Sequence, residues 1–315
     1  MHPKRRSMKF ILYFFAIATS LVHGGEPILP IPQSIPYDAT KAALGEKLFF
    51  DPILSRDYTI TCASCHSFSK GGADARNVSI GIHHQKGSMN APTVLNSVFN
   101  FTQFWNGRAK NLTEQALGPI HNPVEMGLSP KEAALRLQSD PAYSNAFEKI
   151  TARRTITAND IAVMISEYEK TLITPNGKFD LYLRGKDTLS PKELKGYQLF
   201  KTLGCVSCHN GVNVGGNSYQ KMGAILPIER NVKIDDRYTI THREQDKNVF
   251  KVPTLRNIAL TAPYFHDGSA VTLREAIQKM SHHNLGLKLS ETEIDSLIAF
   301  LNTLTGKLSN KELRP

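Results

Sequence analysis

Apolar residues recur at helical spacing in several parts of the chain. Leu44 and Leu48 lie one turn apart and follow Thr40, a residue type that can cap a helix. A longer apolar stripe follows Thr157 and consists of Ile161, Ile165, Tyr168 and Leu172. The segment 293–304 repeats this pattern with Ile294, Leu297, Ile298 and Leu301. Strand-like alternation is short and rare, so the pattern predicts an all-α fold.

Three of the expected helices share one start signal, a serine with a glutamate three residues later. The pairs are Ser129 with Glu132, Ser190 with Glu193, and Ser290 with Glu293. In this capping box the serine side chain accepts from a helical N–H, and the glutamate reaches back to the serine N–H. Each serine therefore marks the start of a helix.

The N-terminal segment has a different character. Lys4, Arg5, Arg6 and Lys9 precede an apolar run at 10–22 that is too short to span a bilayer comfortably. This order is typical of a secretory signal peptide, which we place at 1–24; an uncleaved anchor is the alternative. Residues 26–38 hold four prolines and are expected to form an extended leader.

The formal net charge of +10 does not indicate a particular binding partner. Four of the positive charges lie in the predicted signal peptide, and no basic block remains that would indicate nucleic-acid binding.

All four cysteines belong to two copies of one motif. The copies are "TCASCH", with Cys62, Cys65 and His66, and "GCVSCH", with Cys205, Cys208 and His209. C-x-x-C-H is typical of c-type haem attachment, in which two thiols bond the haem and the histidine ligates the iron. A four-cysteine zinc site would bring its halves within roughly 15–20 residues, and a thioredoxin-like pair would sit in a βαβ pattern. Neither alternative fits, so the sequence predicts two covalently bound haem c groups.

A glycine-rich stretch follows each motif, "KGGAD" in one case and "GGNSYQ" in the other. This repetition predicts two tandem cytochrome c-like domains with one haem each. We place them at 25–180 and 181–315, with the boundary inside 174–188.

The sixth ligand of each iron decides the chemistry, because an iron with an open face can bind a small oxidant. Beyond the second motif, Met222 and Met280 are candidate ligands, and His282 and His283 are rivals. Packing in the core is the other role open to Met280.

Beyond the first motif no methionine is placed equally well. Met89 and Met126 lie in loop-like sequence, near His83, His84 and His121. The segment 90–127 also contains Trp105, Gln115 and Glu125. A glutamate above an open haem face could move a proton during O–O cleavage, and a solvated surface charge is its other interpretation.

The chain resembles the bacterial di-haem cytochrome c peroxidases, whose branches include the MauG enzymes. The resemblance runs from about residue 44 to residue 304. It includes "LGEKLFFDPILS", "NAPTVLNSVFN", "QFWNGRA", "NPVEMG", "FDLYLRG" and "VPTLRNIALTAPYFHDG". It implies a low-potential peroxidatic haem in the N-terminal domain and a high-potential electron-entry haem in the C-terminal domain.

The resemblance also implies roles for individual residues. His66 and His209 match the proximal ligands, and Met280 matches the sixth ligand of the high-potential haem. Glu125 matches the catalytic acid–base, Gln115 a polar neighbour, and Trp105 the residue between the haems. Asn90, with the backbone of Thr261 and Pro263, matches an inter-domain calcium site, for which neutral oxygens are suitable ligands.

One position departs from the family pattern. Well-known members carry a histidine on a loop that reads S-I-G-H, where it blocks the resting peroxidatic haem. Here the loop reads "SIGIHHQKG", so Ile82 takes that position and His83 and His84 follow it. We expect His84 to be the ligand; His83, or a site that is open at rest, are the alternatives.

The expected function is a periplasmic peroxidase that reduces hydrogen peroxide with electrons from a small redox protein, such as a reduced c-type cytochrome. A homodimer is the expected assembly. One alternative is a MauG-like oxidase of protein side chains, although that branch uses tyrosine where Met280 stands. The other is a di-haem electron-transfer cytochrome without peroxidase activity.

Overall fold

The computed structural model describes residues 25–228 and 234–308, so the predicted signal peptide at 1–24 lies outside it. Helices dominate, as predicted, and the described strands form one short antiparallel pair. The N-terminal half contains α1 (Ala39–Phe50), α2 (Cys62–Cys65), α3 (Leu112–His121), α4 (Pro130–Ser139), α5 (Pro141–Thr151) and α6 (Ala158–Lys170). The C-terminal half contains α7 (Lys178–Leu183), α8 (Pro191–Thr202), β1 (Tyr219–Lys221), α9 (Tyr238–Thr241), β2 (Val249–Lys251), α10 (Leu273–Leu285) and α11 (Glu291–Asn302).

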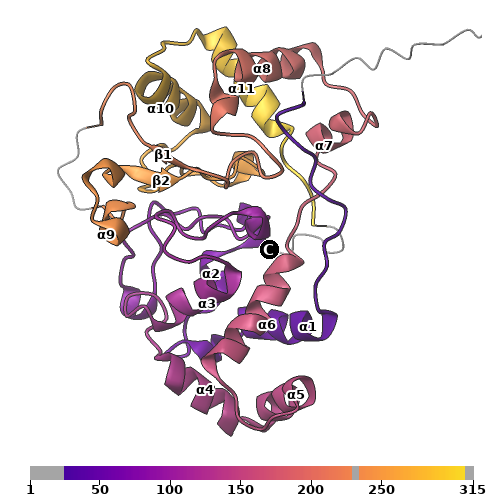
Figure 1. Cartoon of the computed structure of the whole chain (residues 1–315), viewed down its shortest axis with the longest axis vertical. Coiled ribbons are helices and arrows are strands. Elements are labelled where there is room, and N and C mark those ends of the chain that lie inside the picture. Colours follow the sequence, from indigo (N-terminus) through magenta and orange to yellow (C-terminus); the bar gives the residue numbers. More distant parts are fainter. Residues whose placement is uncertain (1–24, 229–233, 309–315) are drawn as a thin grey trace, which may run out of the picture.

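In each half, two helices cross closely at a glycine. In the N-terminal half, a Cβ on Gly45 of α1 would lie 1.9 Å from the carbonyl oxygen of Met164 in α6. In the C-terminal half, a Cβ on Gly196 of α8 would lie 1.9 Å from the carbonyl oxygen of Ser296 in α11. Any larger residue would force the helices apart, so glycine sets both crossings. The two halves therefore repeat one packing arrangement (Figure 1).

Each crossing lies in its own apolar core. Leu44, Leu48, Ile161 and Ile165 are buried in the first core, as their spacing predicted. Phe179, Tyr197, Phe200 and Phe300 fill the second. In α11 the structure corrects one detail, because Ile298 is only partly buried and Phe300 takes the deeper position.

The predicted capping boxes are confirmed at Ser129, Ser190 and Ser290. The prediction that Thr40 caps α1 is wrong. Asp38 is the N-cap, and its carboxylate accepts from the backbone N–H groups of Thr40 and Lys41. Aspartate caps helices as well as serine or threonine does, and an acidic group also suits the positive end of a helix.

The two ends of the described chain cross between the halves. The leader runs from α1 along the side of the molecule to α7 in the other half (Figure 1). Ile28 is fully buried in the C-terminal core. Conversely, Leu308 packs with Phe49 and Tyr168 of the N-terminal half. The leader, which precedes the N-terminal half, therefore packs on the C-terminal half. The segment after α11, which follows the C-terminal half, packs on the N-terminal half.

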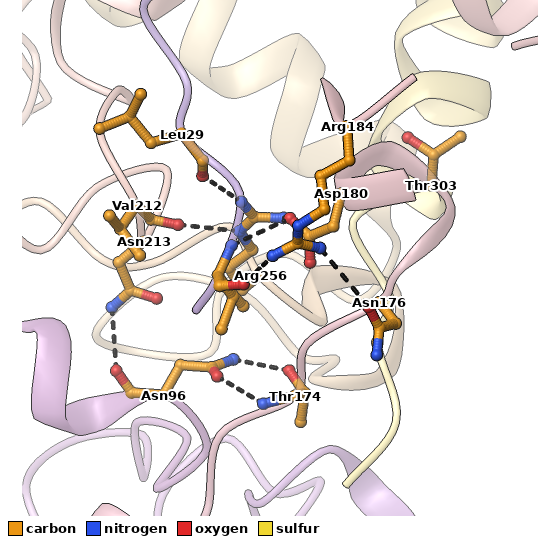
Figure 2. A network of polar contacts seen from close by, with 12 residues as sticks. Leu29, Asn96, Thr174, Asn176, Asp180, Arg184, Val212, Asn213, Arg256 and Thr303 are labelled. Carbon is orange, nitrogen blue, oxygen red and sulfur yellow. Dashed lines mark hydrogen bonds and ion pairs between the residues drawn. The ribbon is translucent and has the colours of Figure 1, made fainter. Parts of the chain in front are cut away.

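A buried ion pair fixes the leader, α7 and the C-terminal loops to one another (Figure 2). Arg256 Nη1 lies 2.8 Å from Asp180 Oδ1, and both side chains are almost completely buried. The guanidinium also donates to the carbonyl oxygens of Val212 and Leu29. Asp180 in turn accepts from the backbone N–H of Ile31. The charge is therefore compensated and hydrogen-bonded on several sides, which a buried arginine requires.

A second network joins the halves directly. Asn96 and Asn257 both adopt a left-handed backbone conformation. Both side chains donate to the hydroxyl of Thr174, which lies between the halves. The Oδ1 of Asn96 accepts from Thr174 N, and that of Asn257 accepts from Gly306 N. Equivalent asparagines thus clamp the connecting segment and the C-terminal segment at one point. Figure 2 shows the contacts of Asn96 with Thr174.

Across 25–228 and 234–308, no helix is both long and apolar enough to cross a membrane.

We expect Asp180→Asn to destabilise the protein strongly. It leaves the buried Arg256 guanidinium without its counter-charge, and breaking a buried pair typically costs roughly 3–5 kcal/mol. Chemical denaturation of the haem-loaded protein measures this change in the free energy of unfolding. Asp295→Asn, which breaks exposed contacts with Arg274 and Lys192, is the control and should have far less effect. Similar small losses in both variants would contradict the structural role of the buried pair.

Candidate functional site

The first C-x-x-C-H motif forms a short capped helix. Thr61 caps α2, and its side chain and that of Ser64 form a reciprocal capping box. His66 follows as the C-cap, with Nδ1 3.1 Å from the carbonyl oxygen of Gly72. Because Nδ1–H donates to this carbonyl, Nε2 is left with its lone pair as the potential ligand atom. Burial lowers the pKa of His66, which keeps the ring neutral.

The second motif repeats this geometry with a tighter turn. Residues Cys205–Ser207 form a 3₁₀ turn preceded by Gly204, whose φ of 90° favours glycine. His209 Nδ1 lies 3.4 Å from the carbonyl oxygen of Val214. Burial lowers the pKa of His209 to about 4. Both histidines therefore present a neutral ring in a fixed orientation, as an axial haem ligand must.

The cysteines do not resemble a redox pair or a zinc site. All four thiols are free, and burial raises the pKa to about 12 for Cys62 and to about 11 for Cys65 and Cys205. A reactive redox cysteine needs a lowered pKa instead. Within the described ranges, no three His, Cys, Asp or Glu side chains gather to hold a metal ion. Attachment of haem through thioether bonds is the chemistry that remains.

Each motif lines a large cavity. The N-terminal cavity has a volume of about 740 Å³ and contains Cys62, Cys65 and His66 in its wall. The C-terminal cavity has a volume of about 400 Å³ and contains Cys205, Cys208 and His209. The attachment groups and a neutral histidine therefore face a space in each half, so the residues fit one c-type haem per half.

The two cavities share a wall. Seven residues line both of them: Asn90, Ala91, Pro92, Thr93, Asn100, Trp105 and Lys251. The indole of Trp105 is held in place, since its Nε1–H donates to the carbonyl oxygen of Asn90 at 2.9 Å. Its ring also contacts His266 edge-on, and His266 stacks on Phe250. An ordered aromatic group thus lies in the wall between the two cavities, and its role between two haems remains a prediction.

In the C-terminal cavity, Met280 of α10 and Met222 both line the wall together with His209. His282 and His283, the rival ligands, do not line this cavity, and the ring of His283 is held by the carbonyl oxygen of Leu226. Of the four candidates for the sixth ligand, the two methionines therefore line the cavity and the two histidines do not. Ligation by Met280 remains a prediction.

In the N-terminal half, α3 corresponds to α10 but differs from it at the position of Met280. The cap of α3 is Asn111 and that of α10 is Thr272, and each accepts from the N–H of a glutamate three residues on. When the two caps are aligned, Pro119 takes the position of Met280. Proline has no side-chain ligand atom, so this helix position supplies no sixth ligand in the N-terminal half.

Glu125, Gln115 and His121 line this N-terminal cavity together with Trp105. Asn122 Nδ2 donates to Glu125 Oε1 at 2.6 Å, which orients the carboxyl group. Burial raises the pKa of Glu125, and the nearby charge of Arg108 and the hydrogen bond from Asn122 partly counteract this. The result is a fixed carboxyl group whose pKa is shifted toward neutral pH, as expected of a general acid–base.

Some residues of this cavity were missed from the sequence. Arg108 lies at its exposed mouth, with its guanidinium 3.4 Å above the ring of Phe104. Glu169 of α6 is buried deeper, beside Cys62, and burial raises its pKa to about 8. Arg108 lies within the segment "QFWNGRA", so the family resemblance could have indicated it. Nothing in the sequence distinguishes Glu169 from an ordinary exposed glutamate of a helix.

The histidines of the expected blocking loop point away from the cavity. Ile82 is buried, and its backbone N–H donates to the carbonyl oxygen of Glu125 at 2.8 Å. His83 and His84 are exposed, and neither lines the cavity. His83 lies 3.8 Å from Asp57. Ligation by either histidine stays a prediction, since both side chains lie outside the cavity in this structure.

The expected calcium ligands lie in one region. Asn90, Thr261 and Pro263 all line the C-terminal cavity. The backbone N–H of Asn90 donates to His266 and its Nδ2 donates to Arg76, so its side-chain oxygen is the group left for an ion. The Asn90 side chain and the backbone carbonyls of Thr261 and Pro263 supply neutral oxygens. Water would have to complete the coordination shell of a calcium ion.

Comparison with known proteins agrees with this geometry. Residues 39–188 match a family model described as "Di-haem cytochrome c peroxidase", and residues 193–305 match one described as "Cytochrome c". The chain is 49% identical to the cytochrome c551 peroxidase of Nitrosomonas europaea, over 92% of this chain and 87% of that protein. It is 44% identical to the cytochrome c peroxidase Ccp of Escherichia coli, over 93% of this chain and 64% of that protein. Among solved structures, a MauG-like protein associated with microbial copper homeostasis aligns with a TM-score of 0.77 and 29% identity, over 90% of this chain and 94% of that one.

The attachment sites predict a haem count that can be measured. The intact mass after denaturation should exceed that of the polypeptide by two haem groups. A Cys62→Ala/Cys65→Ala variant and a Cys205→Ala/Cys208→Ala variant should each retain one covalent haem, because the motifs act independently. A single haem in the unaltered protein would contradict the two-site account.

Proposed function

Since the chain belongs to the di-haem cytochrome c peroxidase family, we propose that it reduces hydrogen peroxide to water with electrons from a small redox protein, such as a reduced c-type cytochrome. The observation that carries this proposal is the N-terminal cavity. Its wall combines a neutral histidine, a helix position without a ligand atom and a fixed carboxyl group of raised pKa. A c-type haem held by Cys62, Cys65 and His66 supplies an iron that can bind and reduce a small oxidant.

Glu125 moves the proton in this proposal. Its carboxylate takes a proton from one oxygen of hydrogen peroxide and returns it to the other, so that water is the leaving group rather than hydroxide. Asn122 holds the carboxyl group during both transfers. Gln115 lines the same wall and offers an amide to the substrate. Arg108 at the mouth favours the ionised form of Glu125, although solvent screens part of its charge.

The C-terminal half receives the electrons. His209 and Met280 would both ligate the second haem, and such an iron has no open face for peroxide. Electrons then cross the shared wall, where Trp105 is fixed by Asn90. This division of roles favours a peroxidase over a simple electron carrier, because α10 carries a methionine at the position where α3 carries Pro119. Met280 also disfavours the MauG-like alternative, because we expect a tyrosine at this position in that branch.

The loop at 79–89 would regulate access. His83 and His84 have φ values of 53° and 57°, a region that residues other than glycine rarely adopt. A second loop state could relieve this conformation and bring His84 to the iron. We propose that His84 caps the fully oxidised protein and that the released state leaves the cavity open.

Three further features belong to the same proposal. Export to the periplasm is supported by the N-terminal sequence pattern. A calcium ion at Asn90, Thr261 and Pro263 would bridge the two halves. A homodimer is the expected assembly, which light scattering of the haem-loaded protein would test.

We expect Glu125→Gln to lower peroxide turnover by roughly 10²–10⁴-fold, the usual contribution of a general acid–base group. Both haem spectra should stay nearly unchanged. Glu169→Gln is the matched control, because it alters a carboxyl group of the same cavity that is already largely protonated at neutral pH, and it should cost far less. Near-normal turnover of Glu125→Gln would contradict the assignment.

The pH profile gives an independent test of the same group. Because the carboxylate must accept the first proton, turnover should fall as the pH drops through the raised pKa of Glu125. Arg108→Gln removes a charge that lowers this pKa, so the acid limb should move to higher pH. Arg108→Lys keeps the charge and should move the limb less. An acid limb that does not respond to Arg108 would argue against this electrostatic coupling.

Met280→His should keep the second haem six-coordinate and lower its reduction potential, since axial ligands tune this potential over as much as ~0.8 V. Spectroelectrochemical titration measures the change, and Met222→Leu is the control. A shift in Met222→Leu alone would assign the ligand to Met222.

If His84 caps the iron, the fully oxidised protein should be low-spin at both haems. His84→Gly should then convert one haem to high-spin, and His83→Gly should not. Electron paramagnetic resonance distinguishes the two spin states. A high-spin haem in the oxidised unaltered protein would show that Ile82 marks a form that is open at rest.

A further inference from the structure

Lys251 is a buried cation in the wall between the two cavities. It is the last residue of β2 and only 4% exposed. Within 25–228 and 234–308, no side chain forms an ion pair or a hydrogen bond with its ammonium group, and burial alone lowers its pKa to about 8. Arg256, another buried cation, is by contrast paired with Asp180. A buried ammonium group without a counter-charge is costly, so this position favours an anion that the described residues do not supply.

The backbone holds Lys251 at the wall between the cavities. Its N–H donates to the carbonyl oxygen of Trp105 at 2.7 Å, and it lies opposite Tyr219 in the strand pair. Neighbouring residues in a strand face opposite sides, and Phe250 is stacked on His266 of the C-terminal cavity. The Lys251 side chain lines both cavities. Both cavities that Lys251 lines are the ones expected to accommodate the two haems.

We propose that Lys251 is the counter-ion of a haem carboxylate, placed in the wall that the two haem cavities share. Each haem c carries two carboxylates, so occupied cavities would bring an anion to this wall. The ammonium group would hold the haem edge, offset the carboxylate charge and favour reduction of the nearby iron, because reduction adds negative charge to the haem. The inference rests on haem occupancy and not on peroxide reduction.

The test compares three variants of the haem-loaded protein. Lys251→Met keeps the apolar stem and removes the charge, while Lys251→Arg keeps the charge. Lys247→Met is the control: it removes one charge from an exposed lysine close in the sequence that pairs with Glu244. The reduction potentials of both haems are measured by spectroelectrochemical titration, and the unfolding temperature is measured by circular dichroism.

We expect Lys251→Met to lower the potential of at least one haem beyond the change in Lys247→Met, and to lower the unfolding temperature. Lys251→Arg should keep potentials near those of the unaltered protein. Haem loss in Lys251→Met with full loading of Lys251→Arg would also support the proposal, because a purely structural stem would be preserved by methionine. Unchanged potentials at both haems, together with an equal or higher unfolding temperature in Lys251→Met, would overturn it. Since neither readout uses turnover, failure here is separable from failure of the proposed peroxidase activity.

Discussion

The buried polar contacts between the two halves are the constraint on which the rest of the structure depends. Asp180 and Arg256 tie the leader and α7 to the C-terminal loops, and Asn96 and Asn257 clamp Thr174 between the halves. These contacts fix the position of each half relative to the other. As a result, two cavities that belong to separate helical cores have a wall in common. Electron transfer needs such a fixed, short separation, and a flexible linker between two cytochrome domains would not provide it.

The two halves show how one packing arrangement can serve two kinds of chemistry. Both contain a helix pair that crosses at a glycine, a C-x-x-C-H turn, and a neutral histidine fixed by a backbone carbonyl. They differ at one helix position and in the loop that follows α3. Where α10 carries Met280, α3 carries Pro119, and the loop after α3 brings in Glu125 with Asn122. If Met280 ligates the second haem, as we propose, a change of side chain at one helix position separates a closed centre from one that can admit a substrate.

Much of this could be predicted from the sequence, because it depends on local signals. The capping serines and the haem motifs follow from spacing alone, and the family resemblance supplied Glu125 and Met280. Features that depend on tertiary contacts could not be predicted. Two examples are the packing of Ile28 in the core of the C-terminal half and the burial of the Ile82 side chain. The isolation of Lys251 also depends on packing, since a lysine in a short strand ordinarily points to solvent.

The central claim is that an electron stored in the C-terminal half reaches peroxide in the N-terminal half, with Glu125 moving the proton. The most direct test is a single turnover. The protein is poised with only the high-potential haem reduced and is mixed rapidly with one equivalent of hydrogen peroxide, while the absorbance of the reduced haem is followed. Reduction of one peroxide to water takes two electrons, of which the reduced haem would supply one and the N-terminal haem the other. The account predicts that the absorbance of the reduced haem disappears with one peroxide per protein, and that Glu125→Gln slows its loss. Persistence of the reduced haem, or the same rate in Glu125→Gln, would contradict the account.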